Sequence, residues 1–294
     1  MGQGRRSQIA VVLAAAAATA GLACSAAHAD PPTSPVSTAP FGQLATPPDV
    51  DYNNGDFTRP ETSATTRFEF RTSSSLTSLT DREQEILQYN SRLDLGSGWK
   101  FGWQIQLPFT EKTTTTFDQP GVQGAAGLSD ALVQSALIHS IDEHWAYGFG
   151  ARLVAPPVTE SLGTDRWQIM PVAGVRYSFL EIGPDTYFVP VVRYAISFGG
   201  NPTARTIREP QIAPTLNIGL PDRWFVTLYP SNDIRINFGT PISGQTGRLF
   251  LPFDAAIGRK FTNNLIVSLE VSVPIVKDYP VYDFKSELKA TWQF

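Results

Sequence analysis

The side chains most able to do chemistry in this sequence are charged residues that alternate with apolar ones along short segments. Thirteen of them fall on the polar faces of such segments: Arg152, Arg166, Arg176, Arg193, Asp233, Arg235, Arg248, Asp254, Glu270, Asp283, Lys285, Glu287 and Lys289. Successive side chains of a β-strand point to opposite faces of the sheet. We therefore expect all thirteen to point to the same side of a sheet, where they could pair with one another or select a charged solute.

Acid–base catalysis has few candidates in the same sequence. Beyond residue 29 the histidines are His139 and His144, and histidine is the side chain that best exchanges protons near neutral pH. His139, Ser140, Asp142 and Glu143 superficially resemble the catalytic set of an outer-membrane phospholipase, but adjacent strand residues face opposite ways. The histidine spacing matches no known ligand pattern. We predict no enzyme, no metal site and no cofactor, with a phospholipase as a minor alternative.

Residues 281–294 indicate which secondary structure carries the charged side chains. Apolar and polar residues alternate there with a period of two. One face holds Tyr282, Phe284, Leu288, Ala290, Trp292 and Phe294, with Ser286 as its only polar member. The other face holds Asp283, Lys285, Glu287, Lys289, Thr291 and Gln293. This period indicates a strand and excludes an amphipathic helix. One apolar, aromatic face and one charged face are typical of a wall between lipid and a polar lumen.

The same end of the chain resembles the C-terminal insertion signal of bacterial outer-membrane proteins. The aromatic residues that carry this resemblance are Tyr282, Trp292 and Phe294. It implies recognition by the barrel-assembly machinery and localisation in the bacterial outer membrane, with the membrane lipids as partners.

Alternation recurs along most of the chain. It is clearest over 99–109, where one face is apolar without exception. The predicted strands are 64–73, 84–96, 99–109, 129–140, 145–153, 166–179, 186–198, 207–219, 223–238, 247–261, 264–276 and 281–294. No run beyond the N-terminal region approaches the ~18 apolar residues of a membrane helix, so a spanning chain must close its sheet. The predicted fold class is all-β, a closed antiparallel transmembrane β-barrel of about 12 strands.

Short and long connections alternate between the predicted strands. The short ones lie at 96–98, 141–144, 183–185, 221–222 and 262–264, and the longer ones near 74–83, 110–128, 156–165, 199–206 and 239–246. Short periplasmic turns and longer outer loops are the asymmetry of outer-membrane barrels. An even strand number places both chain ends in the periplasm.

The N-terminus has the features of an export signal. Arg5 and Arg6 precede an apolar run over 9–23, and Ala27-His28-Ala29 provides a small-residue cleavage site. We predict a signal peptide over 1–29. A lipoprotein signal at Leu22-Ala23-Cys24 and twin-arginine export are weaker alternatives.

Composition limits what the rest of the chain does. The signal contains the single cysteine, two of the 23 basic residues and none of the 27 acidic ones, which leaves a formal charge of −6. This excludes disulfides, and without a basic block we expect no nucleic-acid partner. Residues 30–60, rich in Pro, Thr and Ser, are predicted to form a flexible periplasmic segment, with a lumen plug as the alternative. The barrel is predicted over 61–294.

Several segments resemble the family of outer-membrane transporters named for the meta-pathway of phenol degradation. The similar motifs are Gly127-Leu128-Ser129-Asp130, Leu162-Gly163-Thr164-Asp165-Arg166-Trp167, residues 224–237 and Gly258-Arg259-Lys260-Phe261. Asp165 and Ala155-Pro156-Pro157 depart from the family pattern. The resemblance implies a barrel and transport, with aromatic solutes as its substrates.

The charged face has two interpretations once a barrel is assumed. Exposure to lipid would cost roughly 2 to 4 kcal/mol for each basic residue at mid-depth, so these side chains are expected in the lumen. They could pair and fill it, or line a narrow passage. Barrels of eight strands are filled and those of sixteen are open. We favour an outer-membrane barrel that passively admits small-molecule solutes. A non-conducting structural or adhesive barrel is the alternative, and a soluble periplasmic β-protein is a weaker one.

Overall fold

A computed structural model describes residues 58–75, 78–117, 121–157, 159, 162–183, 185–231, 233–241 and 245–294. The signal peptide predicted over 1–29 and most of the segment predicted over 30–60 lie outside these residues. Within them, no helix has the length and apolar character needed to cross a membrane.

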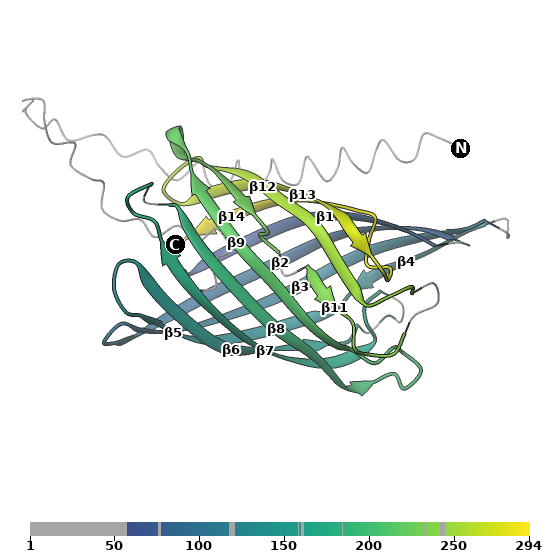
Figure 1. Cartoon of the computed structure of the whole chain (residues 1–294). Helices are drawn as coiled ribbons and strands as arrows, with labels where there is room; N and C mark the ends of the chain where they lie inside the picture. The colour runs from purple at the N-terminus through teal and green to yellow at the C-terminus, as the bar shows by residue number, and fades with distance from the viewer. Residues whose placement is uncertain are drawn as a thin grey trace, which may run out of the picture. The chain divides into compact units, whose positions relative to one another are not determined.

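The described chain forms a closed antiparallel barrel of twelve strands (Figure 1), which confirms the predicted fold class. Its strand segments are β1 (Ser63–Ser74), β2 (Ser78–Gly96), β3 (Trp99–Thr116), β4 (Val122–Leu128), β5 (Ala131–Ser140), β6 (Trp145–Ala155), β7 (Arg166–Ser178), β8 (Tyr187–Gly200), β9 (Arg208–Gly219), β10 (Trp224–Leu228), β11 (Ile234–Ile236), β12 (Leu249–Lys260), β13 (Leu265–Lys277) and β14 (Phe284–Gln293). Two strands of the wall are interrupted, one into β4 and β5 and the other into β10 and β11.

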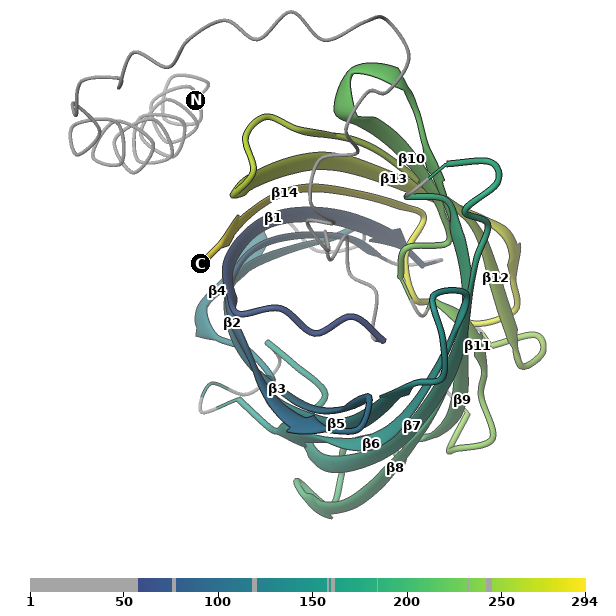
Figure 2. The ribbon, with the colours of Figure 1, turned by 90° about the vertical axis from the view of Figure 1, so that its left-hand side faces the viewer.

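Pairing of the first strand with the last closes the wall. Ser63 of β1 lies opposite Gln293 of β14, and Thr72 lies opposite Phe284. Viewed from the side of the short turns, the sheet is a ring (Figure 2). We call this side the turn end, because β1 begins and β14 ends there, and the opposite side the loop end.

Two predicted loops are partly strand, so those predictions were wrong. Within the expected loop 110–128, β3 continues to Thr116 and β4 pairs with it, from Phe109 opposite Leu128 to Thr115 opposite Val122. β2 likewise begins at Ser78, inside the expected loop 74–83. Threonine favours strands, but these hairpin tips extend past the belt of apolar side chains, so no apolar alternation marks them.

The strand predicted over 223–238 is also broken. Five residues separate Leu228 from Ile234, whereas β9 covers the same interval, from Leu216 to Ile212, with three. Tyr229 adopts a positive φ of 51°, and Pro230 has no N–H to donate to a neighbouring strand. The extra residues form an excursion that brings Ser231 and Asp233 into the lumen.

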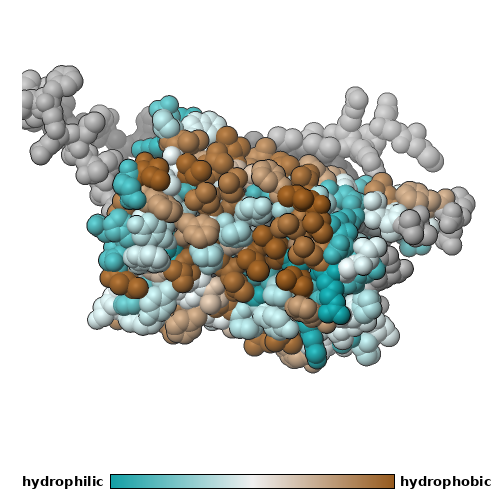
Figure 3. Space-filling view, viewed as in Figure 1, coloured by the Kyte–Doolittle hydropathy of each residue, from teal (hydrophilic) through white to brown (hydrophobic). Residues whose placement is uncertain are grey.

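The outer surface of the barrel is apolar. Ile105, Leu107 and Phe109 of β3 are exposed on it, while Gln106 and Thr110 are buried on the inner face. Figure 3 shows apolar side chains gathered in a broad band across one side of the barrel. Aromatic residues such as Trp145 and Trp224 lie near the strand ends, as in the aromatic girdles of membrane barrels.

Leu269, in the middle of β13 and 48% exposed on this surface, provides a test of the lipid contact. Leu269→Arg is expected to lower the free energy of unfolding in phospholipid vesicles by about 2 to 4 kcal/mol, because the guanidinium would sit in hydrocarbon. Urea titration followed by tryptophan fluorescence measures the loss. The control Gln104→Arg adds the same charge on the lumen side, so an equal loss in both variants would argue against the assigned lipid face.

Candidate functional site in the lumen

A cavity of about 460 Å³ lies inside the barrel. Charged side chains that line it are the basic Arg67, Arg71, Arg152, Arg193, Arg205, Arg235 and Lys289 and the acidic Glu69, Asp130, Glu209, Asp233, Glu270 and Glu287. The two signs nearly balance, but they are distributed unevenly around the wall.

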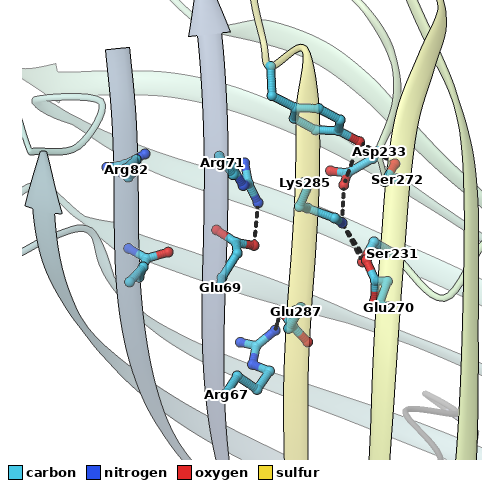
Figure 4. A network of polar contacts seen from close by, with 12 residues as sticks. Arg67, Glu69, Arg71, Arg82, Ser231, Asp233, Glu270, Ser272, Lys285 and Glu287 are labelled. Atoms are coloured by element: carbon cyan, nitrogen blue, oxygen red, sulfur yellow. Dashed lines mark hydrogen bonds and ion pairs between the residues drawn. The ribbon is translucent and has the colours of Figure 1, made fainter. Parts of the chain in front are cut away.

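Lys285 of β14 is the centre of a buried ionic cluster (Figure 4). Its Nζ lies 2.7 Å from Asp233 Oδ2 and 4.0 Å from Asp254 Oδ2, and it also forms an ion pair with Glu270. Ser231, carried inward by the excursion between β10 and β11, accepts a further hydrogen bond from Lys285 at 3.1 Å. The break in the wall thus supplies two partners of this lysine.

More ion pairs extend the cluster along β1 and β11. Arg71 Nη2 lies 2.7 Å from Glu69 Oε2, and Arg235 Nη2 lies 2.6 Å from Asp233 Oδ1. Arg67 Nη1 lies 3.6 Å from Glu287 Oε2 across the closure between β1 and β14. We call this side of the lumen, formed by β1, β11, β13 and β14, the ionic wall.

The opposite side, formed by β5 to β8, has a different character, and we call it the arginine wall. Its inward side chains are largely apolar, with Val154, Met170 and Ala195 in one buried cluster. Its charged members at the cavity are Arg152 of β6 and Arg193 of β8, and no carboxylate of the described residues lies within ion-pair distance of either.

The thirteen charged residues singled out from the sequence occupy three kinds of position. Those that line the cavity are Arg152, Arg193, Asp233, Arg235, Glu270, Glu287 and Lys289. Asp254, Lys285 and Arg176 are buried in the barrel but are not part of the cavity lining. Arg166, Arg248 and Asp283 lie at the loop end.

These three residues at the loop end contact other loop atoms. Arg166 donates hydrogen bonds to the carbonyl oxygens of Ala204, at 2.6 Å, and Pro202, at 3.0 Å. Arg248 is exposed, with its guanidinium 5.7 Å from the centre of the Phe238 ring. Partial burial opposes ionisation of Asp283, but hydrogen bonds from Lys277 and Ser74 lower its pKa overall.

Sequence reasoning missed Arg67, Glu69 and Arg71, which contribute three charges to the ionic wall. They alternate with Phe68 and Phe70 inside a strand that was itself predicted. The alternation rule that identified Lys285 and Glu287 on the last predicted strand would also have identified Arg67, Glu69 and Arg71 on the first.

Tyr282 departs from the face assigned to it. The alternation placed it outward with Trp292 and Phe294, but it is buried, and its hydroxyl lies 2.8 Å from Ser272 Oγ and 3.3 Å from Asp233 Oδ2. The reason is that β14 begins only at Phe284, so strand parity does not extend to Tyr282. Trp292 and Phe294 are exposed on the outer surface.

Two sequence motifs far apart in the chain meet at the loop end. Ser129, between β4 and β5, donates a hydrogen bond of 2.6 Å to the Leu162 carbonyl oxygen, which Arg82 also approaches. Asp130 Oδ2 accepts the Thr164 backbone N–H at 2.8 Å. A Cβ on Gly163 would lie 2.2 Å from Asp130 Oδ1, so a larger residue there would displace the Asp130 carboxylate. We call these contacts the loop latch.

Asp130→Ala is expected to release the latch and to speed hydrogen exchange at the Thr164 amide about tenfold or more, because a hydrogen bond to a charged acceptor contributes about 1.5 to 3 kcal/mol. Exchange measured by mass spectrometry on the folded barrel provides the readout. Asp142→Ala removes a similar carboxylate contact with backbone N–H groups at the turn end and serves as the control. Equal exchange at Thr164 in the wild type and Asp130→Ala would contradict the role of the latch.

The histidines do not form a catalytic site with their neighbours. The His139 ring stacks on Trp99, with centroids 4.6 Å apart, and contacts Tyr147 at 5.5 Å on the outer surface. Ser140 follows on the opposite face of β5. His144 lies in a turn, where a hydrogen bond of 3.0 Å with the Ser178 carbonyl oxygen raises its pKa. Among the described residues no group of ligands suited to a metal ion occurs.

The chain just before β1 enters the barrel at the turn end (Figure 2). Pro60 lines the cavity, and a Cβ on Gly102 would lie 2.8 Å from the Pro60 Cβ. Arg59 lies over the Tyr187 ring at 6.0 Å, and Glu61 pairs with Arg92 at 2.6 Å. Residues 58–61 therefore reduce the opening at the turn end.

A closed antiparallel barrel with an apolar outer belt and a polar interior is the architecture of bacterial outer-membrane proteins, and this chain is an outer-membrane β-barrel. No protein-family model and no curated protein matches the sequence.

Solved structures resemble it in fold. An outer membrane channel from Pseudomonas putida F1 aligns over 80% of this chain and 96% of its own, with 15% identity and a TM-score of 0.62. The β domain of the Bordetella autotransporter BrkA aligns over 80% of this chain and 100% of its own, with 12% identity and a TM-score of 0.48. The CymD monoaromatic hydrocarbon channel aligns over 83% of this chain and 92% of its own, with 7% identity and a TM-score of 0.47.

Proposed function

We propose that this barrel is a passive outer-membrane channel for small molecules, and that the charged side chains of its narrow lumen set which solutes pass. The observation that carries the proposal is the cavity of about 460 Å³ inside a closed barrel, lined by charged and amide side chains. Filled barrels of eight strands enclose only packed side chains. Polar groups that face a cavity select solutes by charge and by the width of the passage.

One feature favours the alternative of a non-conducting structural or adhesive barrel. The excursion between β10 and β11 and the ion pairs of the ionic wall occupy one side of the lumen, and Pro60 narrows the turn end. Paired charges of this kind stabilise a barrel without passing a solute. The two functions differ in conductance.

Single-channel recording in planar bilayers tests the proposal with the folded mature chain in potassium chloride. Discrete conductance steps are expected for the wild-type barrel or for a form lacking residues 30–60. Silence from both forms, with folding shown by heat-modifiable migration on gels, would exclude the channel and leave the structural barrel.

We also propose membership in the phenol-degradation transporter family, supported by the contacts between its motif residues Ser129, Asp130, Leu162 and Thr164 in the loop latch. Aromatic solutes are the substrates that this membership implies. Block of the ion current by phenol at millimolar concentration is the expected result, and a current unaffected by aromatic solutes would count against it.

We propose further that Trp292 and Phe294 act as an insertion signal for the barrel-assembly machinery. Phe294 is 73% exposed on the outer face, and Trp292 is exposed there as well. Deletion of Phe294 is expected to reduce the amount of folded barrel in isolated outer membranes, measured by immunoblot. Gln293→Ala, on the inward face, is the control, and unchanged levels after the deletion would contradict the signal.

A further inference from the structure

We propose that the lumen contains a binding site for a small organic carboxylate with an apolar body, and that Arg152 and Arg193 bind its carboxylate. The inference rests on the proposed channel function, because it names the class of solute that the same cavity takes. It is argued from the arrangement of charge on the arginine wall.

Arg152 and Arg193 lie on either side of β7 and face the same cavity. On β7, Met170 pairs with Arg152 and Val172 pairs with Arg193. Two strand spacings of ~4.8 Å and an offset of two residues separate their backbones. Two arginine side chains can close this distance and direct their guanidinium groups at one small anion.

Neither arginine has a counter-ion within the part of the chain that the structure describes. Arg152 Nε donates a hydrogen bond of 3.0 Å to Gln134 Oε1, and its terminal nitrogens have no bonded partner among the described residues. Arg193 Nε is buried and has no hydrogen-bond partner there. The charged side chains that act most strongly on Arg152 are Arg193 and Arg67, which repel it. Removing a cation from water without a partner is costly, so an anion that enters this cavity is bound favourably.

The other cations at the cavity are already neutralised. Arg67 pairs with Glu287, Arg71 with Glu69, Arg205 with Glu209, and Arg235 with Asp233. Lys289 is attracted by the carboxylates of Glu287 and Glu270. Asp233 attracts Arg193 from a distance, but its two oxygens are already engaged by Arg235 and Lys285. The positive charge that remains available in the lumen is therefore concentrated on the arginine wall.

The surroundings of the two arginines distinguish an organic carboxylate from an inorganic anion. Met170 is the strand neighbour of Arg152, and it packs with Val154 and Ile207 in an apolar cluster that lines the cavity. On the turn side of Arg193, Val189 and Val191 provide a second apolar surface. Arginine binds carboxylates with two parallel hydrogen bonds, while an apolar body would cover these side chains. A cavity of about 460 Å³ is within the size range of small-molecule sites.

The test measures binding of benzoate to the full mature barrel in detergent by ligand-observed NMR and isothermal titration calorimetry. Benzamide has the same shape without the charge, and acetate has the charge without the ring. Benzoate is expected to bind about tenfold or more tightly than either. Benzamide lacks the charge that strengthens hydrogen bonds from the arginines, and acetate lacks the apolar ring whose burial favours binding.

The double variant Arg152→Gln with Arg193→Gln is expected to lose about tenfold or more in benzoate affinity while it keeps the weak affinity for benzamide. Arg248→Gln is the matched control, because it removes the same charge from an exposed side chain outside the cavity lining. Heat-modifiable gel migration checks that each variant is folded, and each single variant is measured in case the double variant does not fold.

Equal affinities for benzoate and benzamide would overturn the proposal, as would acetate that binds as tightly as benzoate. Benzoate binding that is lost equally in Arg248→Gln would also overturn it. Conductance separates this failure from failure of the channel. A barrel that conducts but does not bind benzoate retains the channel function alone, whereas a silent barrel with arginine-dependent binding retains the site and loses the channel.

Discussion

Replacing Lys285 with methionine is expected to lower the free energy of unfolding by about 3 to 5 kcal/mol, because removing one partner from a buried ionic cluster leaves the other charges uncompensated. Three carboxylates surround this ammonium group: those of Asp233, Asp254 and Glu270. Neither carboxylate oxygen of Asp254 accepts a hydrogen bond within the described chain. Arg235 compensates Asp233, but the other two carboxylates depend largely on Lys285.

Urea unfolding of the barrel in phospholipid vesicles, followed by tryptophan fluorescence, measures this loss. The control is Lys277→Met, because Lys277 forms an ion pair with Asp283 in which the side chains are 24% and 34% exposed. Ion pairs in contact with solvent contribute about 0 to 1 kcal/mol. Similar losses in the two variants would show that the cluster around Lys285 is not the main electrostatic support of the lumen.

Removal of residues 30–60 is expected to raise the single-channel conductance by about twofold or more, because the diameter of the narrowest section controls the ion flux. The structural reason is the position of Pro60 inside the cavity, against Gly102, and of Arg59 over Tyr187. The deletion keeps Ser63 and all of β1, so the closure of the barrel is retained.

Arg92→Gln provides a graded control for the deletion, since it removes the ion pair with Glu61 but leaves the segment in the chain. It is expected to increase current fluctuations more than mean conductance. Identical conductance for the full chain and the deleted form would mean that the segment does not limit the current.

The barrel itself was predictable from sequence because lipid requires an apolar side chain at every second position of a spanning strand. Trp99 to Phe109 shows this requirement, and the outer face of β3 follows the predicted parity. The requirement ends where a hairpin leaves the membrane. There both faces of the sheet are polar, as in Thr113 to Thr116, and the strand has no apolar period to detect.

The contacts within the lumen were far less predictable. Alternation along a strand indicates that a side chain points inward. Which inward charges form ion pairs depends on the register of all the strands around the barrel. Arg67 and Glu287 are 220 positions apart in the sequence, and only closure of β1 on β14 brings them together. The excursion that carries Asp233 to Lys285 was hidden for another reason. Its residues continue the apparent strand, and a single proline is a weak signal of a break.

The closure between β1 and β14 places like charges directly opposite one another. Arg67 faces Lys289, Glu69 faces Glu287, and Arg71 faces Lys285. Like charges opposed in this way are unfavourable. A slip of two residues would keep every apolar side chain on the outer face, yet it would place Arg67 against Glu287, Glu69 against Lys285 and Arg71 against Asp283.

The two terminal strands, taken by themselves, would thus prefer a different alignment from the one they adopt. Their native alignment is imposed by the ten strands between them, whose hairpins add up to one fixed stagger around the ring. It is also favoured by the carboxylates of Asp233, Asp254 and Glu270, which attract Lys285 away from Glu69. The register of β1 against β14 therefore depends on the geometry of the whole sheet, and not on these two strands alone.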